Sequence, residues 1–434
     1  MRKWLNEYGM ALVLLALCAF FTGMTWSAQQ RYGRDAGWTL AEGLPANSRV
    51  IVVRPKTNEG EVFAEALTER AEEKEVVVVA TVAGEPFEVL EELDKLADKQ
   101  FDILAVHPTA YRWTIFDRLA EKHVSFKEVS ITAAAPRRGS TFLSRSNLLN
   151  IANQIAVIAI IAIGMTMIII TGGIDLSVGS LVALSAVVTT WLIREYGGGT
   201  SATAIAMFVC GLGGMTACGA MGAFSGFMVT RFRIPAFIVT LSVMLIARGL
   251  AERISENQSI NQVPDSFVWL GVGALVPGIP NAVVLALVLY AIAHVTMTRT
   301  VLGRYIYAVG GNVKAAWLSG LPVNRVLLLV YTVGGLLAGL AGVVLASQLK
   351  SGAATYGLMY EMYVIAAVVV GGTSLLGGEG RIFNTLVGAL IIAVIQNGMN
   401  LLGLESSLQR MVLGGMILGA VVLDSLQRSK VGRF

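Results

Sequence analysis

Apolar residues occur in long runs over most of the chain, and runs of this length predict helices that cross a membrane. One run covers residues 10–26, and the others lie near 147–170, 176–194, 203–230, 236–252, 281–298, 327–347, 358–376, 382–402 and 408–427. Because a helix needs roughly 20 apolar residues to cross a bilayer, the pattern predicts a multi-span α-helical membrane protein with about ten transmembrane helices.

Residues 28–140 follow a different pattern, in which short apolar runs alternate with amphipathic stretches. Strands are predicted at 49–54, 75–82 and 101–107, and helices at 60–74, 86–100 and 111–122. This alternation is typical of a small α/β domain with a parallel, Rossmann-like sheet. The predicted organisation is a first transmembrane helix at 1–27, the inserted α/β domain with its linkers at 28–140, a transmembrane domain at 141–427 and a tail at 428–434.

The run near the start of the chain is either a cleaved signal sequence or a retained helix. Ala28 fits a cleavage site only weakly. The run is long for a signal core and ends in Phe20, Phe21 and Trp26, which suit a membrane interface. We therefore favour retention.

Composition excludes the soluble classes of protein. Of the 434 residues, 55% are hydrophobic and only 14% are charged, which is more apolar surface than a soluble core of this length buries. The cysteines Cys18, Cys210 and Cys218 all lie in apolar runs, so neither a disulfide framework nor a metal site is expected. No GxxxxGKS or GxxxxGKT phosphate loop is present. We expect no catalytic residue, no cofactor and no ATP hydrolysis by this chain.

The basic residues predict how the helices are oriented. The net charge of +4 is too small to indicate nucleic-acid binding. Outside residues 28–140, most Lys and Arg residues nevertheless fall in alternate loops, as expected of cytoplasmic loops. They are Arg2, Lys3, Arg231, Arg233, Arg299, Arg304, Lys314, Arg325, Arg381, Arg428, Lys430 and Arg433. Both termini are therefore expected in the cytoplasm, and residues 28–140 on the outer side of the cell (inner) membrane.

The sequence TGGIDLSVGS at 171–180 places a carboxylate between two membrane runs. Gly172 and Gly173 permit a break in the backbone, and the hydroxyls of Thr171, Ser177 and Ser180 can satisfy the carboxylate of Asp175. One interpretation is that Asp175 caps the next helix, with Leu176 in its first turn, which is compatible with a gating role. A sodium or proton site is the alternative, but one carboxylate without an acidic neighbour is a poor ion site.

Residues 303–320 form a second informative segment, GRYIYAVGGNVKAAWLSG. The pattern predicts a short amphipathic helix after a glycine turn, with Ala315, Ala316 and Ser319 on a small face and Gly320 at its end. Such a helix fits closely into a groove of a partner protein. An ordinary surface loop is the alternative.

Two further features have open interpretations. The glycine- and hydroxyl-rich segment 371–378 permits a kink at a helix end or close helix packing, and we favour packing. Asn397 and Asn400 lie in a membrane run, where they either bond across helices or line a translocation path.

The chain resembles the membrane permeases of ABC importers of the ribose, xylose and galactose class. The resemblance covers about 142–427, roughly two thirds of the chain, and continues loosely into the first helix. The matching stretches are NLLNI at 147–151, TGGIDLSVGS at 171–180, IPAFIVTL at 234–241, ARGL at 247–250, the segment 303–320, VVGGTSLLGG at 369–378 and QNGMN at 396–400.

The resemblance implies a transport subunit for a pentose or hexose that forms the translocation path with a second, identical or similar permease copy. It also implies a cytoplasmic ABC ATPase and a periplasmic or extracellular sugar-binding protein as partners. The segment 303–320 resembles the coupling helix of this family. This likeness places Gly311, Asn312, Ala315, Ala316, Ser319 and Gly320 against the ATPase.

The inserted residues 28–140 depart from this family, whose first helix is followed almost directly by the NLLNI segment. Their strand and helix order is similar to half of one lobe of a periplasmic sugar-binding protein. So small a domain is a poor sugar trap by itself, and we favour a docking or regulatory surface over sugar capture or a purely structural role. A membrane sensor that uses this domain is the alternative function, and the segment 303–320 argues against it. A secondary transporter is disfavoured because Asp175 stands alone.

Overall fold

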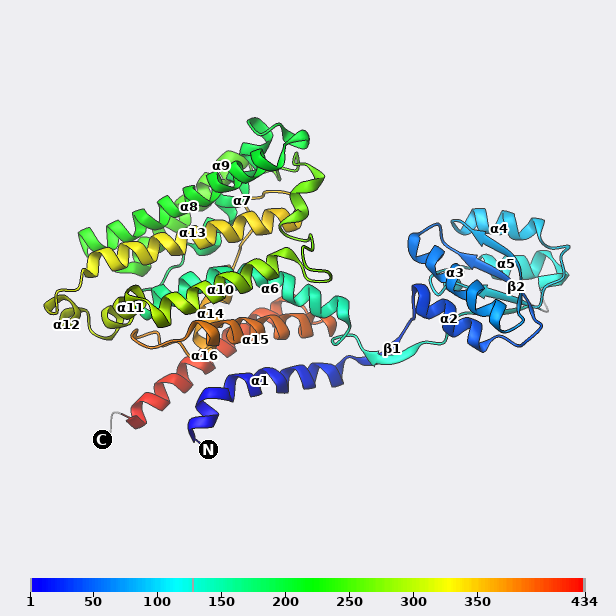
Figure 1. The fold of residues 1–434 in the computed structure, drawn as a ribbon, viewed down its shortest axis with the longest axis horizontal. Helices are drawn as coiled ribbons and strands as arrows, with labels where there is room; N and C mark the ends of the chain where they lie inside the picture. The colour runs from blue at the N-terminus through cyan, green and yellow to red at the C-terminus, as the bar shows by residue number, and fades with distance from the viewer. Residues whose placement is uncertain (1, 127–128, 432–434) are drawn as a thin grey trace. The chain divides into compact units, whose positions relative to one another are not determined.

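A computed structural model describes residues 2–126 and 129–431 and divides them between two compact units (Figure 1). One unit comprises Met1–Met24 with Phe142–Phe434, and the other comprises Thr25–Thr141. Of the predicted tail at 428–434, the structure describes only the residues up to Val431, which belong to the last helix.

The unit of residues 25–141 contains a parallel four-stranded sheet with the strand order β3-β2-β4-β5. The strands are β2 (Arg49–Arg54), β3 (Val77–Ala83), β4 (Ile103–Val106) and β5 (Ser130–Thr132), and the helices are α2 (Gly33–Gly43), α3 (Asn58–Glu73), α4 (Pro86–Lys95) and α5 (Ile115–Lys122). A separate antiparallel ribbon pairs β1 (Trp26–Gln29) with β6 (Arg137–Ser140). The ribbon brings the two ends of the insertion side by side.

Successive residues of β2 point to opposite faces of the sheet, as the pleat of a strand requires. Val50 and Val52 belong to the core that includes Phe63 of α3, whereas Ile51 and Val53 belong to the core that includes Leu93 of α4. This three-layer arrangement explains why β2 is apolar throughout rather than alternating. Helix α2, strand β5 and the β1–β6 ribbon were not expected from the sequence. The strands are only three or four residues long, and α2 buries small residues apart from Leu40.

The second unit is helical, and its described residues contain six helices long and apolar enough to cross a membrane. They are α6 (Arg145–Ile170), α7 (Val178–Glu195), α8 (Ala204–Phe232), α10 (Asn281–Arg299), α13 (Val323–Leu349) and α15 (Ile382–Leu401). The remaining apolar runs correspond to α1 (Arg2–Met24), α9 (Ala236–Ser255), α14 (Tyr360–Val370) and α16 (Ser406–Val431). The prediction of a multi-span helical membrane protein is confirmed, and the number ten stays a prediction.

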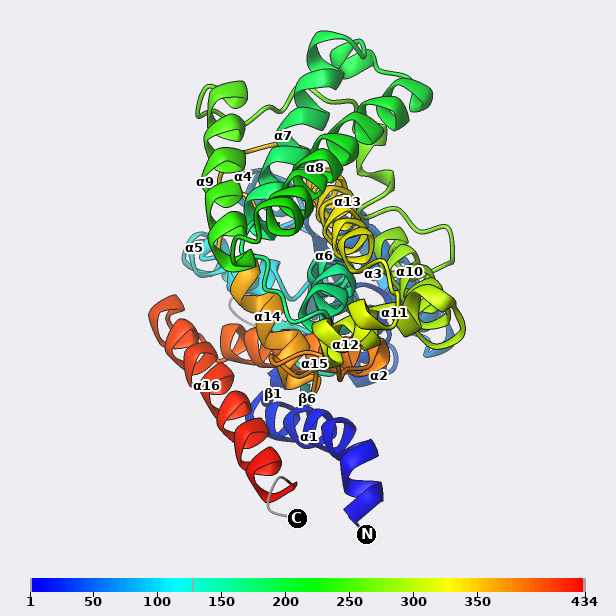
Figure 2. The same cartoon turned by 90° about the vertical axis from the view of Figure 1, so that its left-hand side faces the viewer.

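Helix α6 forms the centre of this unit and is buried almost continuously from Ile155 to Ile170 (Figure 2). Helices α8 and α13 cross at glycines: a Cβ atom on Gly222 would lie 2.3 Å from the carbonyl oxygen of Tyr331, and one on Gly335 would lie 2.4 Å from that of Cys218. Glycine at both positions therefore lets the two backbones touch, as is common between membrane helices.

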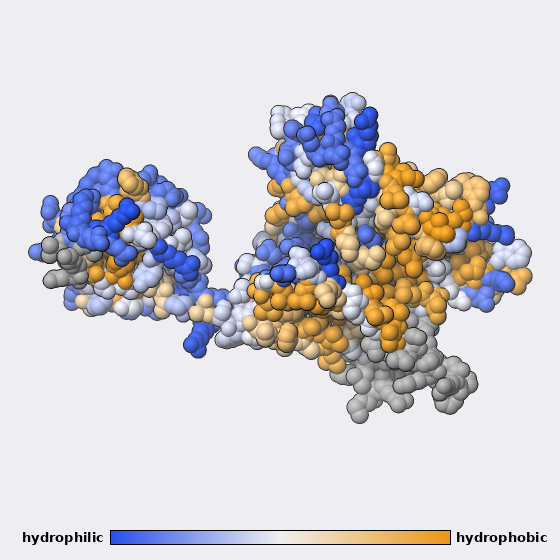
Figure 3. Space-filling model, turned by 180° about the vertical axis from the view of Figure 1, so that it is seen from behind, coloured by the Kyte–Doolittle hydropathy of each residue, from blue (hydrophilic) through white to orange (hydrophobic). Residues whose placement is uncertain are grey.

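The outer faces of the helices are apolar, as a lipid environment requires. Broad apolar areas cover this unit in Figure 3, and large exposed side chains such as Phe208 of α8, Leu245 of α9 and Ile292 of α10 contribute to its surface.

Helix α14 is shorter than the predicted run at 358–376, because it ends at Val370. A Cβ atom on Gly371 would lie 2.6 Å from the carbonyl oxygen of Asn384, and Gly372 has a φ of +84°. The chain thus leaves the helix where it contacts the backbone of α15 and continues as a loop.

Candidate functional site

Helix α6 ends at the first sequence motif, and its last turn is closed by local hydrogen bonds. The Thr171 hydroxyl donates to the Ile168 carbonyl at 2.7 Å, and the Gly173 N–H donates to the same carbonyl at 3.0 Å. Gly172 has a φ of +80°, a conformation that favours glycine. Thr171, Gly172 and Gly173 therefore form the expected break between α6 and α7.

Asp175 is fully buried within this break, but it is not the N-cap of α7. The helix begins at Val178, with Ser177 in the N-cap position, so Leu176 is not in its first turn. One carboxylate oxygen, Oδ1, instead accepts the N–H of Ser177 at 2.8 Å and its hydroxyl at 2.6 Å. The expected capping role is corrected: Asp175 holds a turn that precedes the helix.

Two residues that the sequence analysis did not select fix this turn from other helices. Thr240 of α9 accepts the Leu176 N–H at 3.1 Å through its hydroxyl oxygen. Tyr331 of α13 is buried next to Gly173. A Cβ atom added to Gly173 would lie only 2.3 Å from the tyrosine hydroxyl. Thr240 lies in the IPAFIVTL segment, which was the only sequence signal for either residue.

The second motif forms two helices, α11 (Val301–Gly311) and α12 (Val313–Leu318), separated by Asn312 rather than by a glycine turn. The Asn312 side chain caps α12 by accepting the Ala315 N–H at 3.0 Å. Ser319 ends the helix and donates to the Ala315 carbonyl at 2.9 Å, and Gly320 follows with a φ of +79°. Asn312, Ser319 and Gly320 thus determine where α12 begins and ends.

Ala316 does not lie on the exposed face of α12. Its side chain is 5% exposed and belongs to the core that includes Ile168, Ile306 and Val326. The expected small face of Ala315, Ala316 and Ser319 is therefore corrected, because a helix of six residues must bury one side chain to stay attached to the protein. The large exposed side chains are Trp317 at 69% and Leu318 at 77%.

Helix α11 connects the two motifs directly. A Cβ atom on Gly310 would lie 1.7 Å from the carbonyl oxygen of Ile170, the last residue of α6, and 2.7 Å from the nitrogen of Gly378. The Gly378 N–H donates to the same Ile170 carbonyl at 2.8 Å. Three backbones thus meet without an intervening side chain, which places α11 in direct contact with the end of α6.

Tyr307 adds a second contact between α11 and the loop that follows α14. Its hydroxyl donates to the Gly380 carbonyl at 2.7 Å. Burial raises the pKa of this hydroxyl, which keeps it protonated and able to donate. Within the segment 371–378 itself, Gly371 approaches the backbone of Asn384 and Gly378 that of Gly311, which agrees with the favoured interpretation of close packing.

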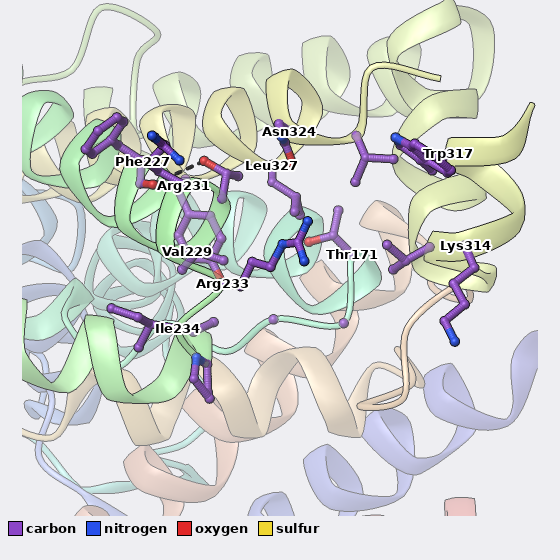
Figure 4. Close-up of a pocket in the computed structure, with 18 residues that line it drawn as sticks. Thr171, Phe227, Val229, Arg231, Arg233, Ile234, Lys314, Trp317, Asn324 and Leu327 are labelled. Atoms are coloured by element: carbon purple, nitrogen blue, oxygen red, sulfur yellow. Dashed lines mark hydrogen bonds between the residues drawn. The ribbon is translucent and has the colours of Figure 1, made fainter. Parts of the chain in front are cut away.

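A pocket of about 930 Å³ brings the two motifs together (Figure 4). Its lining includes Thr171, Gly172 and Gly173 on one side and Val313, Lys314 and Trp317 on the other. Asp175 and Ser177 do not line it, and neither do Gly311, Asn312, Ala315, Ala316, Ser319 or Gly320.

The pocket is electropositive. Arg231, Arg233 and Lys314 line it, no carboxylate does, and Arg233 reaches toward Thr171 in Figure 4. Within the described ranges these three cations form no ion pair. The first residues of α9 and α13 also line the pocket, and helix N-termini carry partial positive charge. Such a site can bind anionic groups of another molecule.

Asn397 and Asn400 lie in different surroundings. The Asn397 amide exchanges two hydrogen bonds with Asn147 of α6, at 2.8 and 2.9 Å, so it bonds across helices. Asn400 accepts from Gln409 of α16 at 2.7 Å and lines a separate cavity. A role in lining a path stays a prediction for both.

Comparison with known proteins identifies the helical unit. The family described as "Branched-chain amino acid transport system / permease component" matches residues 147–421. The chain is similar to the Ribose import permease protein RbsC of Escherichia coli K12, with 43% identity over 255 residues, which are 58% of this chain and 77% of the relative.

Other curated permeases match at similar levels. The D-allose transport system permease protein AlsC of Escherichia coli K12 is 39% identical over 251 residues, 58% of this chain and 74% of the relative. The L-arabinose ABC transporter permease protein AraH of Azospirillum brasilense is 38% identical over 252 residues, 58% of this chain and 71% of the relative. No solved structure matches the chain.

The family match covers more than half of the chain and contains both motifs that meet at the pocket, whereas residues 25–141 lie outside it. The chain is therefore a multi-pass membrane protein that belongs to the permease family of carbohydrate importers.

Proposed function

We propose that this chain is the transmembrane permease subunit of an ATP-driven ABC importer for a monosaccharide, either a pentose or a hexose. The names of its relatives, which are ribose, D-allose and L-arabinose permeases, support this class of substrate. The observation that carries the proposal is the contact of Gly310 with Ile170, because it joins α11, which leads directly into the surface helix α12, to the break in the membrane helices.

The partner on α12 is a cytoplasmic ATPase, which supplies the energy for transport. Exposed Val313, Trp317 and Leu318 offer an apolar contact, and the neighbouring Arg231, Arg233 and Lys314 offer positive charge. An ATPase surface with an apolar groove and acidic residues around it would complement both features. Gly311 and Ala315 are exposed and belong to the proposed contact, whereas Ala316 supports it from within.

Closure of the ATPase would move α12 and α11 together as a lever. The movement would reach Ile170 through Gly310 and then the turn of Gly172, Gly173 and Asp175, which would change the angle between α6 and α7. The turn between α6 and α7 would thus act as the gate, and the hydroxyl hydrogen bonds of Thr171 and Ser177 would hold its two sides in place. Such a mechanism requires two arrangements of the same packed helices.

We place both termini and α12 in the cytoplasm, with ten membrane helices made up of the six long ones together with α1, α9, α14 and α16. A second permease copy would complete the path, and a sugar-binding protein would deliver the substrate from outside. Residues 25–141 would then lie outside the membrane, as a docking or regulatory surface for these partners.

The orientation predicts opposite labelling of two exposed lysine positions. In intact spheroplasts, a membrane-impermeant maleimide should label Lys95→Cys of α4, whereas Lys314→Cys of α12 should react only after the cells are opened. The three native cysteines, Cys18, Cys210 and Cys218, are replaced beforehand. Labelling of position 314 from outside, with protection of position 95, would contradict the orientation.

The coupling role predicts that Leu318→Asp uncouples the permease from its ATPase. A charge placed in an apolar contact costs about 3 kcal/mol, which is roughly a hundredfold weaker docking. Uptake of labelled D-ribose, L-arabinose or D-allose is measured in proteoliposomes that contain the permease, the ATPase and the binding protein.

The matched control is Leu275→Asp, which changes a leucine of similar exposure, 72%, in the loop before α10. This variant should transport like the wild type. Normal uptake by Leu318→Asp would show that α12 is not the docking helix.

A further inference from the structure

A second cavity, of about 240 Å³, lies among α6, α14, α15 and α16. Its polar lining consists of Gln154, Tyr360, Tyr363, Gln396, Asn400 and Gln409, and the rest is alanine and isoleucine. No charged side chain lines it. The cavity is thus polar but neutral, unlike the electropositive pocket beside α12.

Four of these polar groups have no partner among the residues that the structure describes. Gln409 donates to Asn400 at 2.7 Å and to the Leu404 carbonyl at 2.9 Å. In contrast, the amides of Gln154 and Gln396 and the hydroxyls of Tyr360 and Tyr363 form no hydrogen bond with any described residue. Gln154 is exposed, and Tyr360, Tyr363 and Gln396 are half-buried, so their polar groups can bond to water or to a polar solute that enters the cavity.

The chemistry of the cavity matches the hydroxyl groups of a sugar. A glutamine amide both donates and accepts hydrogen bonds, as a sugar hydroxyl does. The rings of Tyr360 and Tyr363 lie 6.5 Å apart in an edge-to-face arrangement and offer apolar surface to the C–H groups of a sugar ring. The cavity offers no counter-charge to the ammonium and carboxylate groups of an amino acid, which makes a neutral solute the better match.

All four helices contribute to the cavity from the same end. Gln154 lies near the start of α6, Tyr360 and Tyr363 near the start of α14, Gln396 toward the end of α15, and Gln409 near the start of α16. In the proposed orientation this is the extracytoplasmic end.

We propose that this cavity is a monosaccharide site of the permease, which holds the sugar after the binding protein releases it. The inference rests on the proposed function and adds to it a defined location and a neutral, hydroxyl-rich ligand.

The test replaces Gln396 with leucine, which keeps the size of the side chain but removes its hydrogen bonds. Proteoliposomes with the ATPase and the binding protein are given D-ribose, L-arabinose or D-allose, and sugar uptake and ATP hydrolysis are measured together. We expect the amount of sugar transported per ATP to fall about tenfold, while the binding protein still stimulates hydrolysis. Gln396→Asn should retain part of the transport, and Gln258→Leu, in an exposed loop, should behave like the wild type.

A direct measurement separates this inference from the function on which it rests. Saturation-transfer NMR with the same sugars and the permease in nanodiscs should give a signal that Gln396→Leu and Tyr363→Leu lose. An unchanged sugar-to-ATP ratio together with an unchanged NMR signal would overturn the site. If the wild type takes up none of these sugars, the proposed function fails, and the NMR signal still decides whether the cavity binds sugar.

Discussion

Gly310→Ala is expected to lower coupled transport at least about tenfold, whereas Gly311→Ala, one residue further along α11, should lower it far less because it changes only the exposed surface of the helix. A Cβ atom at position 310 would lie 1.7 Å from the Ile170 carbonyl oxygen and 2.7 Å from the Gly378 nitrogen, both of which are backbone atoms. Backbone cannot move aside as a flexible side chain can, so α11 must separate from α6. Overpacking of this kind costs about 1–3 kcal/mol or more.

The two glycines form a matched pair because both lie in the last turn of α11. A Cβ atom on Gly311 would meet nothing within 4 Å, and alanine there favours the helix by about 1 kcal/mol. ATP hydrolysis and sugar uptake are measured on the same proteoliposomes, after size-exclusion chromatography shows that each variant is folded. We expect Gly310→Ala to hydrolyse ATP while uptake falls at least about tenfold. Equal uptake by the two variants would contradict the lever mechanism.

Much of the helical unit could be predicted from the sequence, because the requirement for about 20 apolar residues acts on each segment separately. The break at 171–173 was also predictable, since adjacent glycines next to a lone carboxylate between apolar runs have few other uses. The residues of other helices that contact this break were not predictable. Thr240 and Tyr331 come from helices distant in the sequence, and only the tertiary structure brings them to Leu176 and Gly173.

The orientation of α12 shows a second limit of sequence analysis. Six residues span less than two turns, so the pattern around Ala315 and Ala316 has no measurable period. The exposed tryptophan and leucine that follow, Trp317 and Leu318, would be assigned to the core by composition alone. Only the packing of Ala316 beneath them shows which face of α12 is available to a partner.

The contact between Gly173 and Tyr331 gives the second prediction of large effect. Gly173→Ala should lower the stability of the permease by about 1–3 kcal/mol and reduce uptake, because the new Cβ atom would lie 2.3 Å from the Tyr331 hydroxyl. That hydroxyl is buried and has no hydrogen-bond partner in the described structure. Tyr331→Phe alone should therefore be close to neutral, since no bond is lost.

Combining the two changes tests whether the clash is specific. Removing the hydroxyl makes room for the Cβ atom, so the double variant Gly173→Ala with Tyr331→Phe should recover about 1 kcal/mol of the lost stability and part of the uptake. Thermal unfolding in nanodiscs and sugar uptake are measured for the wild type, both single variants and the double variant. Tyr290→Phe is the matched control, because Tyr290 is also buried with an unpartnered hydroxyl but is not among the nearest neighbours of Gly173. If Tyr290→Phe restored Gly173→Ala as well as Tyr331→Phe does, the gain would reflect general loosening of the helices, and Tyr331 would not be the residue that sets the position of the break.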